Sequence, residues 1–355
     1  MGEPAPQAPS MAQAPFSDVD ADIVLRSSDN IDFRLHKTIL TRAFHGFDDL
    51  LSGLATAAAY QTGTSDAMDS SDEHGRPILV LTERADVLDA LFRLFYYVDS
   101  PTLSDFKVLR AVCLCLDRYC VKTVPYIIHE LLIKALNVPA HQRGTTPGTV
   151  YALACRLQLD DIALLAARAS LPNSEILREL QIDDVQLISS AQYHALNVYF
   201  NDCREAAARV VADPLVLIPA VELPCSSSHS TDKLLEYLQN PGAFGQFHPI
   251  RSGECECGMT ETLAGTRKDL AGQLPAEPVV IPEWLCDYLE ACNDELYRKP
   301  DAENVTRPKF YVKYLREAMA CPFCARSIDS FLSFLPRLKE IIDEEVGKVQ
   351  LIATS

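Results

Sequence analysis

The chain has 355 residues, with 32 Lys or Arg and 49 Asp or Glu, so its formal net charge is −17. This length predicts two or three domains, and a hydrophobic fraction of 48% is enough to bury a core. The acidic balance argues against a dedicated nucleic-acid binder and against docking on an anionic membrane, because both need concentrated Lys and Arg. No apolar run approaches the length of a membrane span, and no secretory signal is visible. We therefore expect an intracellular protein without a membrane partner, in either nucleus or cytoplasm.

The N-terminal part of the sequence predicts three short strands. Ile23–Leu25 is a short apolar run, and the Ser-Ser-Asp-Asn sequence at 27–30 is typical of a hairpin turn. Residues 31–36 then alternate between apolar and polar side chains, which predicts a half-buried strand. Ile78–Leu81 predicts the third strand.

Apolar residues at helical spacing predict helices over most of the remaining chain up to about residue 212. Residues 55–76 break this pattern, because they are small and polar and include a cluster of Asp and Glu. The sequence thus predicts an α+β fold, a small sheet flanked by helices and followed by α-rich regions. The expected parts are a flexible tail at 1–17, an N-terminal domain at 18–137 with a mobile acidic loop at 55–76, a helical extension at 138–212, a linker or irregular segment at 213–252, and an α-rich region with paired cysteines at 253–355.

Several polar residues fall at the ends of the predicted strands. Asp22 precedes the first strand, His36-Lys37 follows the second, and Phe47 lies in the second short helix. This order resembles the opening of a BTB/POZ domain, of the fungal, basidiomycete-like type. His45-Gly46 stands where the family has Ser-Pro, and the long acidic loop is a second departure.

The resemblance continues into the later helices and the C-terminal region. The stretches 151–156 and 203–207 look like the helical extension of fungal BTB proteins, whose C-terminal region often carries separated Cys pairs before a final helix. It implies a non-enzymatic protein–protein interaction module. The expected partners are a second copy of the chain, a cullin-type ubiquitin ligase scaffold or a transcriptional regulator. Dimerisation would use apolar surface on the first helices and the first strand. The matched residues Asp22, His36, Lys37 and Phe47 would be either ordinary fold residues or contact residues.

Four cysteines form two close pairs, Cys255 with Cys257 and Cys321 with Cys324. Four thiolates can hold a structural zinc ion, and two close pairs brought together by the fold are a common way to build such a site. The one-residue spacing of the first pair weakens the expectation, and His229 or His248 could replace one ligand. The alternative is four reduced thiols without a metal.

Two other functions are left open by the motifs. Cys321-Pro-Phe-Cys324 also resembles a thiol oxidoreductase motif, but helical spacing precedes it where a strand is expected. A zinc-containing nuclear regulator is the other alternative. Lys309, Lys313 and Arg316 would supply a basic helix face for nucleic acid, although a solvated face is the simpler interpretation. Hydrolase and nucleotide-phosphate motifs are absent, so no catalytic residues are expected.

The closing segment has apolar residues from Ile328 to Val349 at alternating spacings of three and four. This heptad-like stripe predicts either a coiled coil or packing against its own domain. Pro336 is expected to kink or restart the helix.

Overall fold

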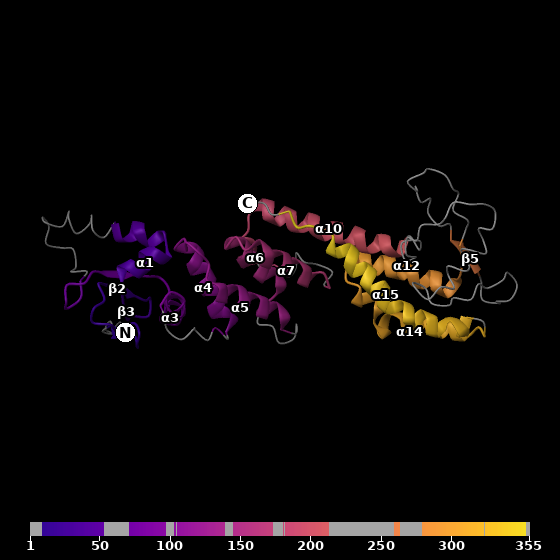
Figure 1. Ribbon diagram of the computed structural model, residues 1–355, viewed down its shortest axis with the longest axis horizontal. Helices are drawn as coiled ribbons and strands as arrows, with labels where there is room; N and C mark the ends of the chain where they lie inside the picture. The colour runs from indigo at the N-terminus through magenta and orange to yellow at the C-terminus, as the bar shows by residue number, and fades with distance from the viewer. Residues whose placement is uncertain are drawn as a thin grey trace, which may run out of the picture. The chain divides into compact units, whose positions relative to one another are not determined.

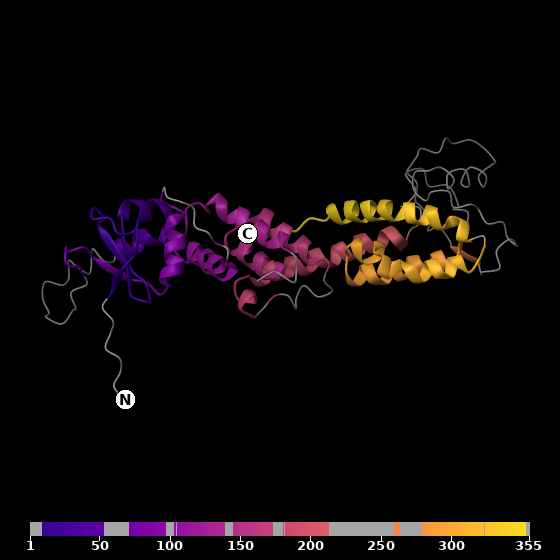
Figure 2. The ribbon, with the colours of Figure 1, turned by 90° about the horizontal axis from the view of Figure 1, so that it is seen from below.

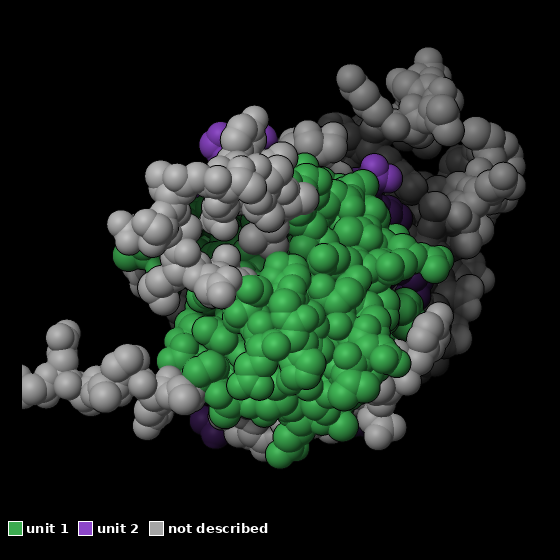
Figure 3. Space-filling view, turned by 90° about the vertical axis from the view of Figure 1, so that its left-hand side faces the viewer, with its two compact units in different colours: residues 1–166, 177–188 green, residues 167–176, 189–355 purple. Residues whose placement is uncertain are grey.

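The computed structural model describes residues 9–52, 71–96, 103, 105–138, 145–172, 180, 182–212, 259–262, 279–322 and 324–352. These residues form an α+β structure that is mostly helical (Figure 1). The chain divides into two compact units, of which the first comprises 1–166 with 177–188 and the second 167–176 with 189–355 (Figure 3). The first boundary between the two units falls between residues 166 and 167, within the helix α7 (Asp160–Ser170).

A four-stranded sheet in the first unit has the order β1-β3-β2-β4. The central hairpin, β2 (Ile23–Arg26) and β3 (Ile31–Leu35), is antiparallel, as the alternating pattern predicts. Asn30 adopts φ 59° in its turn, a conformation that Asn tolerates better than most residues. β1 (Ser10–Met11) pairs in parallel with β3, and β4 (Ile78–Val80) pairs in parallel with β2.

Residues 10–17, expected to be part of a flexible tail, instead belong to the sheet and the core. Backbone hydrogen bonds join Ser10 to Asn30 and Ala12 to Asp32, each at 2.9 Å. Phe16 is fully buried, and its ring lies 5.7 Å from that of Phe33. Burying a Phe side chain contributes about 1.5–3 kcal/mol, which is enough to hold this Pro-rich segment on the domain.

Helices pack beside the sheet and complete the first unit (Figure 2). α4 begins where the Asp105 carboxylate accepts a hydrogen bond from the Lys107 N–H, and α6 begins with Pro147 after the cap residue Thr146. A further helical stretch at 46–52 follows α1. The helices are α1 (Lys37–Ala43), α3 (Ala85–Arg93), α4 (Phe106–Arg118), α5 (Tyr126–Asn137), α6 (Pro147–Arg156), α7 (Asp160–Ser170) and the short α9 (Ile182–Val185).

A buried carboxylate connects α9 to the rest of this unit. Asp184 is 2% exposed, accepts a hydrogen bond from Thr149 Oγ1 at 2.7 Å and forms an ion pair with Arg110 at 3.2 Å. A buried charge without partners would be costly, so these contacts explain why 177–188 belongs to the first unit.

The second unit consists mainly of long helices that lie alongside one another (Figure 1). α15 runs through Pro336 as one helix, so the helix does not restart there, which was one of the two outcomes expected at this proline. Phe331, Leu338 and Ile342 of α15 are fully buried, so its apolar stripe packs within its own unit. The elements are α10 (Ser190–Ala212), β5 (Met259–Thr262), β6 (Val279–Pro282), α12 (Glu283–Arg298), α13 (Glu303–Thr306), α14 (Pro308–Met319), the 3-10 helix η2 (Cys324–Ser327) and α15 (Ile328–Gly347).

Candidate functional site

Three of the polar residues singled out in the sequence meet at the start of α1. The Asp22 carboxylate accepts a hydrogen bond from the Lys37 backbone N–H at 2.7 Å. The residue that precedes β2 therefore caps the N-terminus of this helix. The His36 backbone N–H donates to the Tyr96 hydroxyl at 2.9 Å. Burial raises the pKa of Tyr96 to about 12, so this hydroxyl stays neutral at physiological pH. These contacts give Asp22, His36 and Lys37 a role in positioning α1 on the sheet.

Phe47, in the helical stretch at 46–52, is fully buried. Its ring stacks on Tyr119 at a centroid distance of 4.9 Å and meets Phe44 edge-on at 5.5 Å. Phe47 is therefore a core residue of the first unit, and its side chain is not available to a partner.

The outer face of the sheet carries a row of four side chains in register across all four strands. Met11 pairs with Asp32, Asp32 with Arg26, and Arg26 with Val80, so their side chains lie on one face. The Arg26 guanidinium donates two hydrogen bonds to the Asp32 carboxylate, at 2.6 and 2.9 Å. Met11 and Val80, on the two edge strands, are 43% and 66% exposed. The row, here called the sheet row, thus places exposed apolar groups on both sides of a partly buried ion pair.

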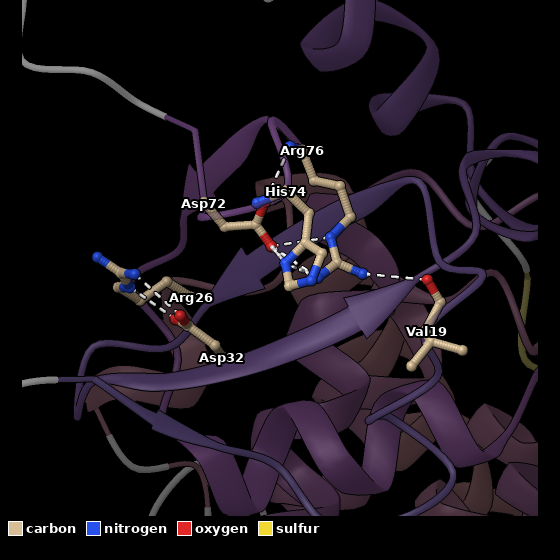
Figure 4. Close-up of polar contacts among 6 residues, drawn as sticks. All are labelled: Val19, Arg26, Asp32, Asp72, His74 and Arg76. Atoms are coloured by element: carbon tan, nitrogen blue, oxygen red, sulfur yellow. Dashed lines mark hydrogen bonds and ion pairs between the residues drawn. The ribbon is translucent and has the colours of Figure 1, made fainter.

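A structured turn lies beside the sheet row (Figure 4). The Asp72 carboxylate accepts a hydrogen bond from the Arg76 guanidinium at 2.8 Å. The Arg76 side chain also donates a hydrogen bond to the Val19 carbonyl at 3.4 Å. Burial would raise the pKa of the Asp72 carboxyl, but hydrogen bonds from Arg76 and His74 hold it below its ordinary value. This turn, expected to be part of the mobile loop at 55–76, is instead fixed to the sheet; residues 53–70 lie outside the described residues.

The sequence pattern missed the sheet row for a physical reason. Arg26 and Asp32 flank the hairpin turn with opposite charges, which could have suggested their cross-strand pair. Met11 lies in a strand of only two residues, which is too short to show an alternating pattern in the sequence. Val80 joins the row only because β4 pairs in parallel with β2, which is distant in sequence. Ile23–Leu25, expected to lend apolar surface to a dimer, is buried.

The two cysteines of the second pair lie close together where α14 ends and η2 begins. Both are buried, and their thiols are joined by a hydrogen bond. Burial and this hydrogen bond raise the pKa of Cys324 to about 11, although the Trp284 side chain acts in the opposite direction. Two neighbouring thiols could supply two of the four ligands of a tetrahedral zinc site. The other proposed ligands, Cys255 and Cys257, and the substitutes His229 and His248, lie outside the described residues.

Four other buried thiols in the described part of the chain are poorly suited to nucleophilic chemistry. Burial raises the pKa of Cys113, Cys115 and Cys292 to about 12, and that of Cys203 to about 11. A protonated thiol is a weak nucleophile at neutral pH. Within the described ranges, no three or more His, Cys, Asp or Glu side chains gather closely enough to hold a metal ion.

Among the helices that the structure describes, none combines the length and the apolar composition needed to cross a membrane. No protein-family model matches the chain, and no curated protein matches it.

Proposed function

We propose that this chain is a non-enzymatic, intracellular interaction protein that self-associates through a BTB/POZ-like N-terminal domain. The order of elements supports the proposal: a hairpin, α1, a second helical stretch, and then β4 in parallel with the hairpin's first strand. Asp22, His36, Lys37 and Phe47 occupy positions that build this arrangement. The resemblance and the fold therefore point in the same direction.

The observation that carries the self-association proposal is the sheet row. Edge strands with exposed apolar side chains favour pairing with another chain unless charge or cover prevents it. Here Met11 and Val80 stand at the two edges, and the ion pair between them is already satisfied within the chain. A second copy could cover these apolar groups without leaving Arg26 or Asp32 unpaired.

Paired substitutions on the full-length chain test this role. Met11→Asp with Val80→Asp places charge on both edges and is expected to give a monomer by light scattering. Ile182→Asp is the matched control, because Ile182 is an exposed apolar residue on α9 of the same unit. Retention of a dimer by the double variant would reject the sheet row as the contact surface.

We further propose that partners include a cullin-type ubiquitin ligase scaffold or a transcriptional regulator. The resemblance alone supports this step. Biolayer interferometry between the full chain and a purified cullin N-terminal region tests it directly. Micromolar or tighter binding supports an adaptor, and absence of binding across the accessible concentrations rejects that assignment.

The alternative of a thiol oxidoreductase is less well supported, because the helix α14 precedes Cys321 where this redox motif normally follows a strand. A structural zinc ion held by Cys255, Cys257, Cys321 and Cys324 remains our proposal for these cysteines. In that site, zinc would cross-link the C-terminal region and leave no open position for catalysis.

A further inference from the structure

One face of α14 in the second unit is exposed and basic. Lys309, Lys313 and Arg316 lie on it at positions i, i+4 and i+7, over about 10 Å of helix. Val312 and Met319 flank them and are also exposed, Met319 by 66%. The opposite side of the helix buries Tyr314 and Ala318, and the Tyr314 ring meets that of Tyr288 on α12 at 5.6 Å. The five exposed residues are called the α14 face below.

The fold makes limited use of the three cations of the α14 face: Lys313 hydrogen-bonds to the Tyr314 side chain, and the nearby carboxylates of Glu317 and Asp287 help to raise its pKa. None of them forms an ion pair with any carboxylate in the described part of the chain. Basic residues of α15 behave differently: Arg337 pairs with Glu340, and Lys339 pairs with Glu303 at 2.7 Å. A chain with net charge −17 therefore keeps three exposed cations along one helix face, with the Glu317 carboxylate beside Lys313 at one side of it.

Lys313 is also held in a defined position. Its ammonium group lies over the Tyr314 ring, 4.4 Å from the centroid. Such a cation–π contact restricts the long side chain, so less conformational entropy is lost when a partner contacts it.

We propose that the α14 face docks an acidic protein segment in which carboxylates alternate with apolar side chains. Charge complementarity selects the acidic partner, because Lys309, Lys313 and Arg316 present three exposed cations on one line that form no ion pair among the described residues. Val312 and Met319 provide apolar contact beside them, and the flexible Met thioether adapts to partners of different shape. Single-stranded nucleic acid fits less well, because stacking needs exposed aromatic rings and Tyr314 is buried beneath the face.

The test uses the full-length chain and a fluorescent peptide of repeated Glu-Glu-Leu-Leu, with binding read by polarisation. A triple variant, Lys309→Glu with Lys313→Glu and Arg316→Glu, reverses the charge of the face. The matched control reverses three exposed cations of the first unit that also lack a carboxylate partner among the described residues, as Arg42→Glu with Lys107→Glu and Lys134→Glu. Both variants change the net charge equally, and circular dichroism checks their helix content.

The docking proposal predicts at least about tenfold weaker peptide binding by the α14 triple variant and unchanged binding by the control. Val312→Ser with Met319→Ser should weaken binding at least about threefold, and a Glu-Glu-Ser-Ser peptide should bind more weakly than the leucine peptide. Equal loss in both triple variants, no binding by the wild-type chain, or tighter binding of an oligothymidine of equal charge would each overturn it. The self-association proposal is tested at Met11 and Val80, which are not part of the α14 face. Failure of either proposal therefore does not affect the other.

Discussion

The backbone N–H of Gly46 donates a hydrogen bond to the Tyr119 carbonyl at 2.9 Å, and a Cβ atom at position 46 would lie 2.8 Å from that oxygen. The neighbouring His45 N–H donates to the Cys120 carbonyl at 2.9 Å. Two backbone hydrogen bonds therefore join the start of the helical stretch at 46–52 to the end of α4. This close backbone approach explains why a residue without a side chain stands at position 46.

Replacing Gly46 tests how much this contact matters. Gly46→Ala forces the added methyl group against backbone atoms, and we expect a loss of about 1–3 kcal/mol in the free energy of unfolding. Gly347→Ala is the control, because a Cβ there meets nothing within 4 Å at the end of α15. Thermal unfolding should show a lower midpoint for the first variant and an unchanged or slightly higher one for the second. Equal midpoints for the two variants would contradict the packing described here.

The buried contact between Asp184 and its partners gives a second prediction. Asp184→Ala leaves Arg110 and Thr149 without their acceptor, and we expect destabilisation of about 3–5 kcal/mol, measured by urea unfolding. Asp183→Ala removes the exposed neighbouring carboxylate and should change stability by less than about 0.5 kcal/mol. Similar effects of the two substitutions would show that Asp184 does not hold α9 in place.

Alkaline pH should destabilise the first unit through its buried thiols. Burial raises the pKa of Cys113 and Cys115 to about 12, above the ordinary value near 9. The folded chain binds these protons more tightly than the unfolded chain, so their contribution is fully present below about pH 9 and is lost as pH rises towards 12. The unfolding midpoint should therefore fall between about pH 9 and 11, with a shallower slope in Cys113→Ala. Parallel slopes for wild type and variant would remove these thiols from the explanation.

The zinc proposal makes a separate prediction about metal content. Full-length protein purified without chelator should contain nearly one zinc ion per chain, and Cys321→Ser with Cys324→Ser should lose it. Cys113→Ser with Cys115→Ser is the control, since these buried cysteines of α4 belong to the first unit. A wild-type chain without zinc would end the proposal, and so would a double Cys321/Cys324 variant that keeps it.

The sequence predicted the elements whose apolar residues recur at strand or helix spacing. The alternation at 31–36 and the turn at 27–30 gave the central hairpin, and helical spacing gave α4, α5 and α10. The 3-4 spacing from Ile328 to Val349 gave α15, but it could not decide between a partner and the helix's own unit. That choice depends on α10 and α13, which pack against α15 in the structure.

Features that depend on distant pairing could not be predicted in this way. β1 has two residues in a Pro-rich segment, and it forms only because β3 supplies hydrogen-bond partners. The assignment of 177–188 to the first unit rests on Asp184, whose partners are 35 and 74 residues away. The basic spacing on α14 was visible in the sequence, but its exposure and lack of carboxylate partners were not.

Sedimentation equilibrium of the full-length wild-type chain over a dilution series tests the central claim most directly. Self-association predicts a mass of about twice 39.3 kDa at tens of micromolar, falling towards the monomer mass on dilution or staying dimeric if the contact is tight. A mass equal to one chain at every concentration up to tens of micromolar would contradict the account of this protein as a self-associating interaction module.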